Sequence, residues 1–289
     1  MEYIPNYIVI GLMVGGIYSL VAVGVVIVYK ATKVFNFAVG EMVALGGCVG
    51  AALLSMGLNP WLSIVITMII LGLLGVLIER GIMRFFTAQT TVIALIATVF
   101  LSFLISGGKQ FIWGSTGQSL YLPFPTKSIV WGDIFISWDL LIPFIAVMCL
   151  IALFILFFER TKLGLGIKAI ADDPHLGRSK GIGPNQVVML TWLIAGTTAA
   201  VGGIFLGCRM GVTPTMSIVG LIAFPIVFLG GLESIHGVII AGLAVGVIEQ
   251  VVGGVIGTAW MQLVPWILLI VVLIIRPYGL FGEKRVERV

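Results

Sequence analysis

The sequence predicts an all-α polytopic membrane protein, because it is very hydrophobic, its apolar runs are long, and those runs lack strand periodicity. Mean hydropathy is +1.21, with 60% hydrophobic and only 10% charged residues. The runs reach about 20 residues, the length a helix needs to cross ~30 Å of hydrocarbon. Without the alternation of a membrane β-barrel, spanning backbone must satisfy its hydrogen bonds as helices.

We expect one transmembrane domain over residues 1–289, with eight or nine helices that include broken or re-entrant segments. The run 219–231 is short, contains Pro225 and ends at Gly230-Gly231, so it is typical of a helix that does not cross the membrane in one piece. The predicted runs are 7–29, 35–57, 61–78, 91–106, 140–158, 187–208, 219–231, 238–255 and 261–275.

The distribution of basic residues predicts the orientation. With the N-terminus outside, the segments 30–34, 79–90, 159–186 and the C-terminal tail are cytoplasmic, and they hold 13 of the 16 Lys and Arg residues. The segment 107–139 is then an external loop. No Lys or Arg precedes Lys30, so the first run lacks the basic start of a signal peptide and is expected to remain as a span.

The cytoplasmic segment 159–186 has its own helical pattern. Gly164 and Gly166 allow a sharp exit from the preceding span, while Asp173 suits an N-cap with Pro174 at the first helical position, and Gly181 suits a C-cap. Two interpretations stay open on spacing alone. The segment is either a solvated connector or a surface of small residues that docks on another protein.

Four motifs resemble the branched-chain amino acid ABC-importer permeases of the LivH/LivM family. They are GGIYSLVAVGVVIVYKATKVFNFAVGEMVALGG (15–47), LGLGIKAIADDPHLGRSKGIGPNQV (163–187), FPIVFLGGLESIHGVIIAG (224–242) and IRPYGLFGE (275–283). They occur in family order over nearly the whole chain. Val39, Glu233 and His236 depart from the usual family pattern, which leaves the substrate open.

The resemblance implies an ABC-importer permease fold in a bacterial inner membrane. It implies two ATPase subunits that bind ATP and Mg, a second homologous permease, an external solute-binding protein and surrounding lipid as partners. It also implies that the 159–186 segment is the coupling loop that docks on the ATPase. The residues expected to carry this docking are Gly164, Gly166, Ala169, Ala171, Asp172, Asp173, Pro174 and Gly181.

A translocation path is predicted where the second span and the broken run can unwind, because transporters line their paths with discontinuous helices. Plain helix packing is the alternative for the glycines, and Glu41 could instead pair with Lys30 or Lys33 at the interface. The candidate path residues are Asn36, Phe37, Gly40, Glu41, Gly46, Gly47, Phe224, Pro225, Gly230 and Gly231.

No residues with catalytic or metal-binding spacing are found in the sequence, and the phosphate-binding glycine pattern is absent, so we expect no enzyme activity on this chain. Nucleic-acid binding is not expected. The predicted function is import of branched-chain amino acids or a related small solute, with ATP hydrolysis on separate subunits. The alternative is an ion-coupled secondary transporter or a passive channel for a solute such as urea or an amide.

Overall fold

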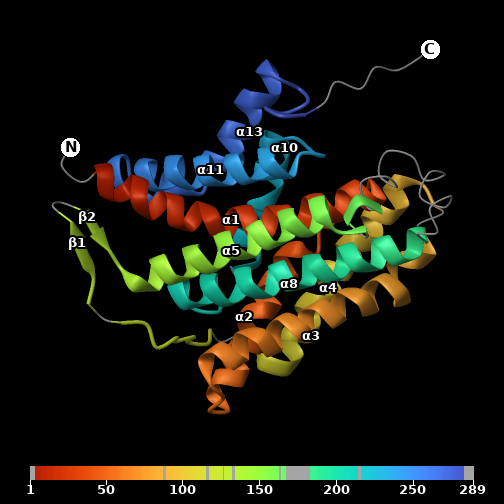
Figure 1. The fold of residues 1–289 in the computed structure, drawn as a ribbon, viewed down its shortest axis with the longest axis horizontal. Helices are drawn as coiled ribbons and strands as arrows, with labels where there is room; N and C mark the ends of the chain where they lie inside the picture. The colour runs from red at the N-terminus through yellow and green to blue at the C-terminus, as the bar shows by residue number, and fades with distance from the viewer. Residues whose placement is uncertain are drawn as a thin grey trace.

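The fold is that of a computed structural model, which describes residues 4–86, 89–114, 117–125, 127–131, 134–162, 164–166, 183–213 and 216–282. Over these residues the chain is mainly helical, and most helices run along the long axis of the molecule (Figure 1). The helices are α1 (Ile4–Thr32), α2 (Val39–Ser55), α3 (Pro60–Gly81), η1 (Met83–Phe86), α4 (Thr91–Trp113), α5 (Trp138–Arg160), α8 (Pro184–Met210), α9 (Met216–Leu221), α10 (Ala223–Gly230), α11 (Ile235–Val255), α12 (Thr258–Met261) and α13 (Val264–Ile275). Two strands, β1 (Ile129–Trp131) and β2 (Ile134–Ile136), form an antiparallel hairpin.

The predicted fold class is confirmed. Among the described residues, α1, α3, α4, α5, α8 and α11 are long and apolar enough to cross a membrane, and α2, α9 with α10, and α13 are shorter apolar helices. Each of the nine predicted runs therefore corresponds to a helix or a helix pair. The short seventh run is divided at Ile222 into α9 and α10, with Pro225 inside α10, as expected for a broken helix.

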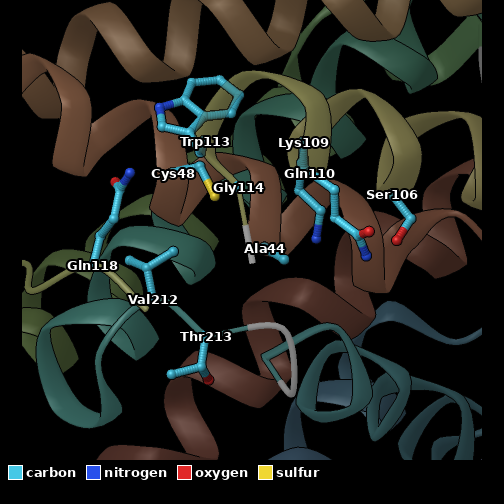
Figure 2. A pocket seen from close by; sticks show the side chains of 10 residues that line it. All are labelled: Ala44, Cys48, Ser106, Lys109, Gln110, Trp113, Gly114, Gln118, Val212 and Thr213. Atoms are coloured by element: carbon cyan, nitrogen blue, oxygen red, sulfur yellow. The ribbon is translucent and has the colours of Figure 1, made fainter. Parts of the chain in front are cut away.

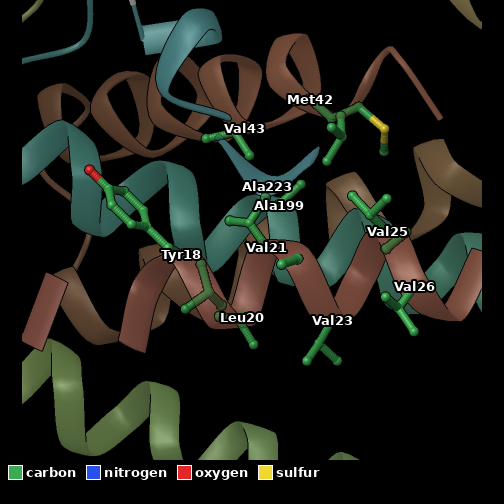
Figure 3. Close-up of a cluster of buried hydrophobic side chains, with 14 of the residues drawn as sticks. Tyr18, Leu20, Val21, Val23, Val25, Val26, Met42, Val43, Ala199 and Ala223 are labelled. Carbon is green, nitrogen blue, oxygen red and sulfur yellow. The ribbon is translucent and has the colours of Figure 1, made fainter. Parts of the chain in front are cut away.

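Two helices form the centre of the bundle. In α1 and α8, 78% of the most apolar stretch is buried, compared with 22% in α4 and α5. Helix α1 packs against α11, α8, α5 and α10, and α8 also contacts α3 and α2. Figure 3 shows part of this core, where Leu20, Val21 and Val25 of α1 gather with Val43 of α2 and Ala199 of α8. The outer helices leave their large apolar side chains exposed, as lipid-facing helices do.

Small residues allow α1 and α11 to pack closely. A Cβ atom on Gly15 would lie 2.7 Å from the carbonyl oxygen of Gly242 and 2.9 Å from Cα of Leu243. Ser19, one turn along α1, donates a hydrogen bond of 3.0 Å to the carbonyl oxygen of Ile239. Between helices in lipid, such backbone approach supplies the van der Waals contact that drives association.

Replacing Gly15 with Val is expected to separate these helices and to destabilise the fold by about 1–3 kcal/mol, the usual range for overpacking. The thermal unfolding temperature of the detergent-solubilised protein measures the effect. Gly107→Val is the matched control, because Gly107 is also helical and a Cβ there meets nothing within 4 Å. Equal unfolding temperatures for the two variants would contradict the close α1–α11 contact.

The predicted loops are shorter than expected where the structure describes them. Residues 107–113, taken from sequence as the start of the external loop, are the last two turns of α4. Gly107 and Gly108 are possible capping residues but do not take a positive φ, so the helix continues to Gly114, which has a φ of 73°. Asn6 near the start of α1 accepts a 3.2 Å hydrogen bond from the Phe135 backbone in β2, which places the hairpin at that end of the bundle.

Candidate functional site

The chain is not helical between α1 and α2, over residues 33–38, which we call the interrupted segment. It begins at Lys33, whose φ of 57° ends the helix. Thr98 of α4 supports it, because Oγ1 donates to the carbonyl oxygen of Phe35 at 3.0 Å and accepts from the Phe37 amide at 3.3 Å. Asn36 Oδ1 accepts from the Ala38 amide at 3.0 Å. Protein groups therefore satisfy this backbone, which is the condition for non-helical structure inside a bilayer.

Aromatic side chains join the interrupted segment to α10. The Phe37 and Phe224 rings are stacked, with centroids 4.7 Å apart and an interplanar angle of 24°. Phe35 and Phe228 are stacked in the same way at 5.2 Å. Two of the predicted path residues, Phe37 and Phe224, are thus in contact, although they are far apart in the sequence. Such ring pairs contribute about 0.5–1.5 kcal/mol each beyond their buried area.

One ion pair fixes the first residue of the interrupted segment. Lys33 Nζ lies 2.8 Å from Oε1 of Glu233, in the turn between α10 and α11. Both side chains are about one third exposed, so solvent screens the attraction and its contribution to stability is modest. The pair nevertheless sets where the end of α1 meets the α10–α11 turn.

A second ion pair fixes the first turn of α2. Glu41 Oε2 lies 2.6 Å from Nζ of Lys109 in α4, and Lys109 also donates to Ser217 Oγ in α9 at 3.2 Å. Glu41 therefore pairs with Lys109, and not with Lys30 or Lys33 at the membrane interface, which was the alternative interpretation of its sequence position. Sequence reasoning missed Lys109, because it was assigned to the external loop rather than to a helix. The helical continuation of α4 is the feature that brings it to the site.

A cavity of about 460 Å³ lies at the end of the bundle where α1 ends, and Asn36 lines it, so we call it the Asn36 cavity. Its volume falls in the range of about 300–1,000 Å³ that is usual for small-molecule sites. Thr98 of α4, Trp192 of α8 and Met83 of η1 contribute to its wall, together with Lys30 and polar residues from the starts of α4 and α8.

A smaller pocket of about 50 Å³ lies farther along α4, and we call it the Lys109 pocket. Figure 2 shows Lys109, Gln110 and Ser106 along one side of it and Gln118 and Thr213 along the other. The two cavities follow the same helix: Thr98 lines the first and Ser106 the second, and eight residues of helix separate them by about 12 Å. Lys33, Val34 and Asn36 of the interrupted segment line the Asn36 cavity, while Ala44 and Cys48 of α2 line the Lys109 pocket.

Three predicted path residues on α2 are packing positions. Gly40 lies against Gly220 of α9, where a Cβ on Gly220 would be 2.6 Å from Cα of Gly40. Gly46 and Gly47 lie against α8 and the start of α9, and both are buried. These glycines therefore have the role of the alternative interpretation, which is helix packing. They affect the site by holding α2 close to α9.

The remaining predicted path residues shape the end of α10. Pro225 is buried within the helix, and Gly230 packs against the backbone of α11. Gly231 ends the helix with a φ of 101° and lies beside Gly282 of the C-terminal segment. None of these three residues lines the Asn36 cavity or the Lys109 pocket.

Only the two ends of the predicted coupling loop lie in the described part of the chain, namely 159–162 with 164–166, and 183–186, where α8 begins at Pro184. Gly164 is buried, and its amide donates to Oγ1 of Thr161 at 3.0 Å. A Cβ on Gly164 would overlap the backbone of Phe158, so the absence of a side chain lets Gly164 pack closely against the end of α5. Gly166 is also buried. The other predicted docking residues lie outside the described residues, and they are Ala169, Ala171, Asp172, Asp173, Pro174 and Gly181.

Two buried carboxylates were missed by sequence reasoning, which placed them at the interface. Glu249 of α11 is 5% exposed and accepts a 3.3 Å hydrogen bond from Tyr18 of α1. Glu79 of α3 is 1% exposed and forms two hydrogen bonds with Arg84, at 3.0 and 3.2 Å. Their position near the ends of spans did not reveal that they are buried, because the partner of Glu249 comes from another helix and the partner of Glu79 from the following turn.

Replacing Arg84 with Met is expected to destabilise the fold by about 3 kcal/mol, because it leaves Glu79 buried without this partner. The double variant Glu79→Met with Arg84→Met should recover most of the loss, since it removes both charges together. Titration with SDS in mixed micelles measures the folded fraction. A double variant less stable than Arg84→Met alone would contradict the importance of this pairing.

Comparison with known proteins agrees with this architecture. The family model described as "Branched-chain amino acid transport system / permease component" matches residues 7–273. The high-affinity branched-chain amino acid permease protein LivH of Salmonella typhimurium is 32% identical, and BraD of Pseudomonas aeruginosa is 30% identical; each alignment covers 96% of both chains. The fructose import permease protein FruF of Bifidobacterium longum is 26% identical over 80% of this chain and 64% of its own length.

No solved structure matches the chain. The family model spans almost all of the helical bundle, from α1 into α13, and the interrupted segment, α10 and both cavities fall within it. On that coverage, together with the identity to full-length relatives, the chain belongs to the branched-chain amino acid transport permease family.

Proposed function

We propose that this protein is the permease subunit of an ATP-driven importer that carries branched-chain amino acids or related small solutes across a membrane. Its membership of the permease family supports this function. The observation that carries it is that α4 lines two cavities, and that the non-helical residues 33–38 form part of the wall of the larger one. Transporters place their paths at such discontinuous helices.

The two cavities differ in size. In an alternating-access cycle one side of the path is open while the other is closed, and a large and a small cavity fit one such state. The Asn36 cavity is about 460 Å³ and the Lys109 pocket is about 50 Å³. A solute passing from one to the other must displace the contacts of residues 33–41, namely the Phe37–Phe224 stack and the two ion pairs. These contacts involve α4, α9 and α10, so a small movement of α2 relative to these helices opens the route. Interrupted helices permit such movements between rigid packed units.

The energy for this movement comes from partner subunits. We propose that residues 163–182 dock on an ATPase subunit, that the complex holds two such subunits, which bind ATP and Mg, and that this chain binds no cofactor of its own. The predicted docking residues begin at the end of α5, which packs directly on α1. Movement of the loop would therefore be transmitted to α1, and so to the interrupted segment that follows α1, through the contact between α5 and α1.

The complete importer would contain a second, homologous permease and receive its solute from an external binding protein. The exposed apolar faces of α3 and α4 offer surface both for lipid and for the second permease. We place the protein in a bacterial inner membrane with the N-terminus outside and the C-terminus in the cytoplasm. The charge distribution supports this orientation, and the Lys109 pocket would then face outward.

Uptake by the reconstituted complex tests this function. The permease would be placed in vesicles with its second permease and ATPase subunits, and radiolabelled leucine would be supplied with the binding protein. We expect uptake with ATP and none with a non-hydrolysable analogue. Uptake that followed a proton or sodium gradient and ignored ATP would support the secondary-transporter alternative instead.

A further inference from the structure

A charged lysine lies inside the bundle, and helix packing does not explain it. Lys109 is 8% exposed, and its ammonium contacts Glu41 at 2.6 Å and Ser217 at 3.2 Å. Replacing a buried ion pair by apolar residues is often neutral or stabilising, so such a pair is weak grounds for a purely structural role. Ionisable residues within membrane helices usually mark pathways for polar solutes.

The surroundings of Lys109 are polar, and Glu41 lies behind its ammonium, one turn of α2 before the pocket-lining Ala44, rather than in the pocket wall itself. Lys109 lines the Lys109 pocket with Ser106, Gln110, Gln118 and Thr213, whose side chains offer both donors and acceptors. A volume of about 50 Å³ has room for a few water-sized groups, which suits a charged head group but not a whole apolar side chain. Cys48 lines the same pocket and is partly exposed.

We propose that the Lys109 pocket is a subsite for the head group of a zwitterionic amino acid, in which Lys109 takes the α-carboxylate and Glu41 takes the α-ammonium. This rests on the proposed function and specifies its substrate class. The Lys109 ammonium is a donor only and the Glu41 carboxylate an acceptor only, so each matches one end of the zwitterion. In binding, the ligand replaces one ion pair with two and leaves the buried charge balanced.

Ligands with a single charge are excluded from this subsite, because they would leave the buried charge unbalanced. An amine bound to Glu41 would leave Lys109 without its carboxylate, and an acid bound to Lys109 would leave Glu41 without its cation. An uncompensated buried charge is strongly unfavourable, which gives the subsite its selectivity.

Binding there would also prepare the route to open. Glu41 lies in the first turn of α2, directly after the interrupted segment, and its direct ion pair with Lys109 connects this turn to α4. A ligand that separates Glu41 from Lys109 removes that contact between the two helices. The head group would thus loosen the first turn of α2 and the interrupted segment that precedes it.

Labelling of Cys48 tests the subsite directly. In the reconstituted complex with Cys149→Ser and Cys208→Ser, a small methanethiosulfonate reagent would report access to the pocket, without ATP or transport. The probes are leucine, isopentylamine and 4-methylpentanoate, which carry the same branched chain with both charges, only the amine, or only the acid. Leucine at ten times its dissociation constant should slow labelling by roughly tenfold, by mass action. The amine and the acid should leave the rate unchanged.

Two variants separate the subsite from general effects. Glu41→Gln with Lys109→Gln removes both charges together and should abolish protection by leucine. Glu159→Gln with His236→Gln is the control, because this pair lies 4.0 Å apart on exposed side chains outside the pocket, and protection should persist. Equal protection by all three probes, or protection retained in the Glu41/Lys109 variant, would overturn the proposal.

The outcome is distinguishable from failure of the proposed function. ATP-driven leucine uptake by the unmodified complex, without protection of Cys48 by leucine, would overturn the subsite and leave the importer function in place. Absence of ATP-driven uptake would overturn the importer function, whatever the labelling shows.

Discussion

Replacing Ala169 with Trp together with Asp173 with Arg is expected to reduce ATP-driven uptake to the level seen without ATP, while the chain still inserts into the membrane. A docking surface of small residues needs close backbone approach, which an indole prevents. Reversal of the charge at position 173 also removes the predicted N-cap of the second short helix. Leucine uptake and the amount of permease in the membrane are the two measurements.

The conservative pair Ala169→Ser with Asp173→Glu is the control for this result. It keeps a small side chain at one position and a carboxylate at the other, so it should retain most of the uptake. Normal uptake by the Trp/Arg variant would show that the segment is a solvated connector, which was the second interpretation of its sequence.

Truncating Phe37 and Phe224 to Ala is expected to let leucine leak from loaded vesicles without ATP. The two stacked rings join the interrupted segment to α10, and their removal leaves that segment held by the Phe35–Phe228 stack, the Lys33–Glu233 ion pair and Thr98. Truncation of the buried Phe224 also destabilises by about 3–5 kcal/mol, and truncation of the half-buried Phe37 by less. Release of preloaded radiolabelled leucine over time measures the leak.

A second aromatic pair provides the matched control. Phe157 and Phe158 in α5 also have one half-buried and one buried ring, with centroids 5.5 Å apart, but they pair with each other rather than with a ring of the interrupted segment. Their truncation to Ala should lower stability without increasing the leak. A leak in both double variants would attribute the effect to general loosening of the bundle.

The sequence was sufficient to predict the helical bundle, because hydrophobic length and the helical hydrogen-bond requirement of the bilayer leave few alternatives. The break in the seventh run was also predictable, since Pro225 and Gly230-Gly231 act locally. The interruption after α1 was indicated by Asn36 and Gly40, but its support by Thr98 was not, because that hydrogen bond joins residues 63 positions apart.

Charged pairs were the least predictable part of the site. Whether a carboxylate near a span end faces the interface or the bundle interior depends on the helix beside it, and this is not encoded locally. Glu249 is buried because Tyr18 lies opposite it in α1, and Glu41 because α4 extends far enough to present Lys109. Helix α4 ends seven residues beyond the predicted end of its apolar run. This extension brings Lys109 into contact with Glu41, which is the main charged contact of the site.

Crosslinking across the interrupted segment tests directly whether residues 33–38 must move during transport. Cysteines in place of Lys33 and Glu233, whose side chains join the interrupted segment to the turn after α10, would be joined by a short bis-methanethiosulfonate reagent in the reconstituted complex, in a background without Cys48, Cys149 and Cys208. We expect crosslinked complexes to stop importing leucine and to recover on reduction, because residues 33–38 must move away from α10 and the turn that follows it in every cycle. Uptake at the full rate by fully crosslinked complexes would contradict it.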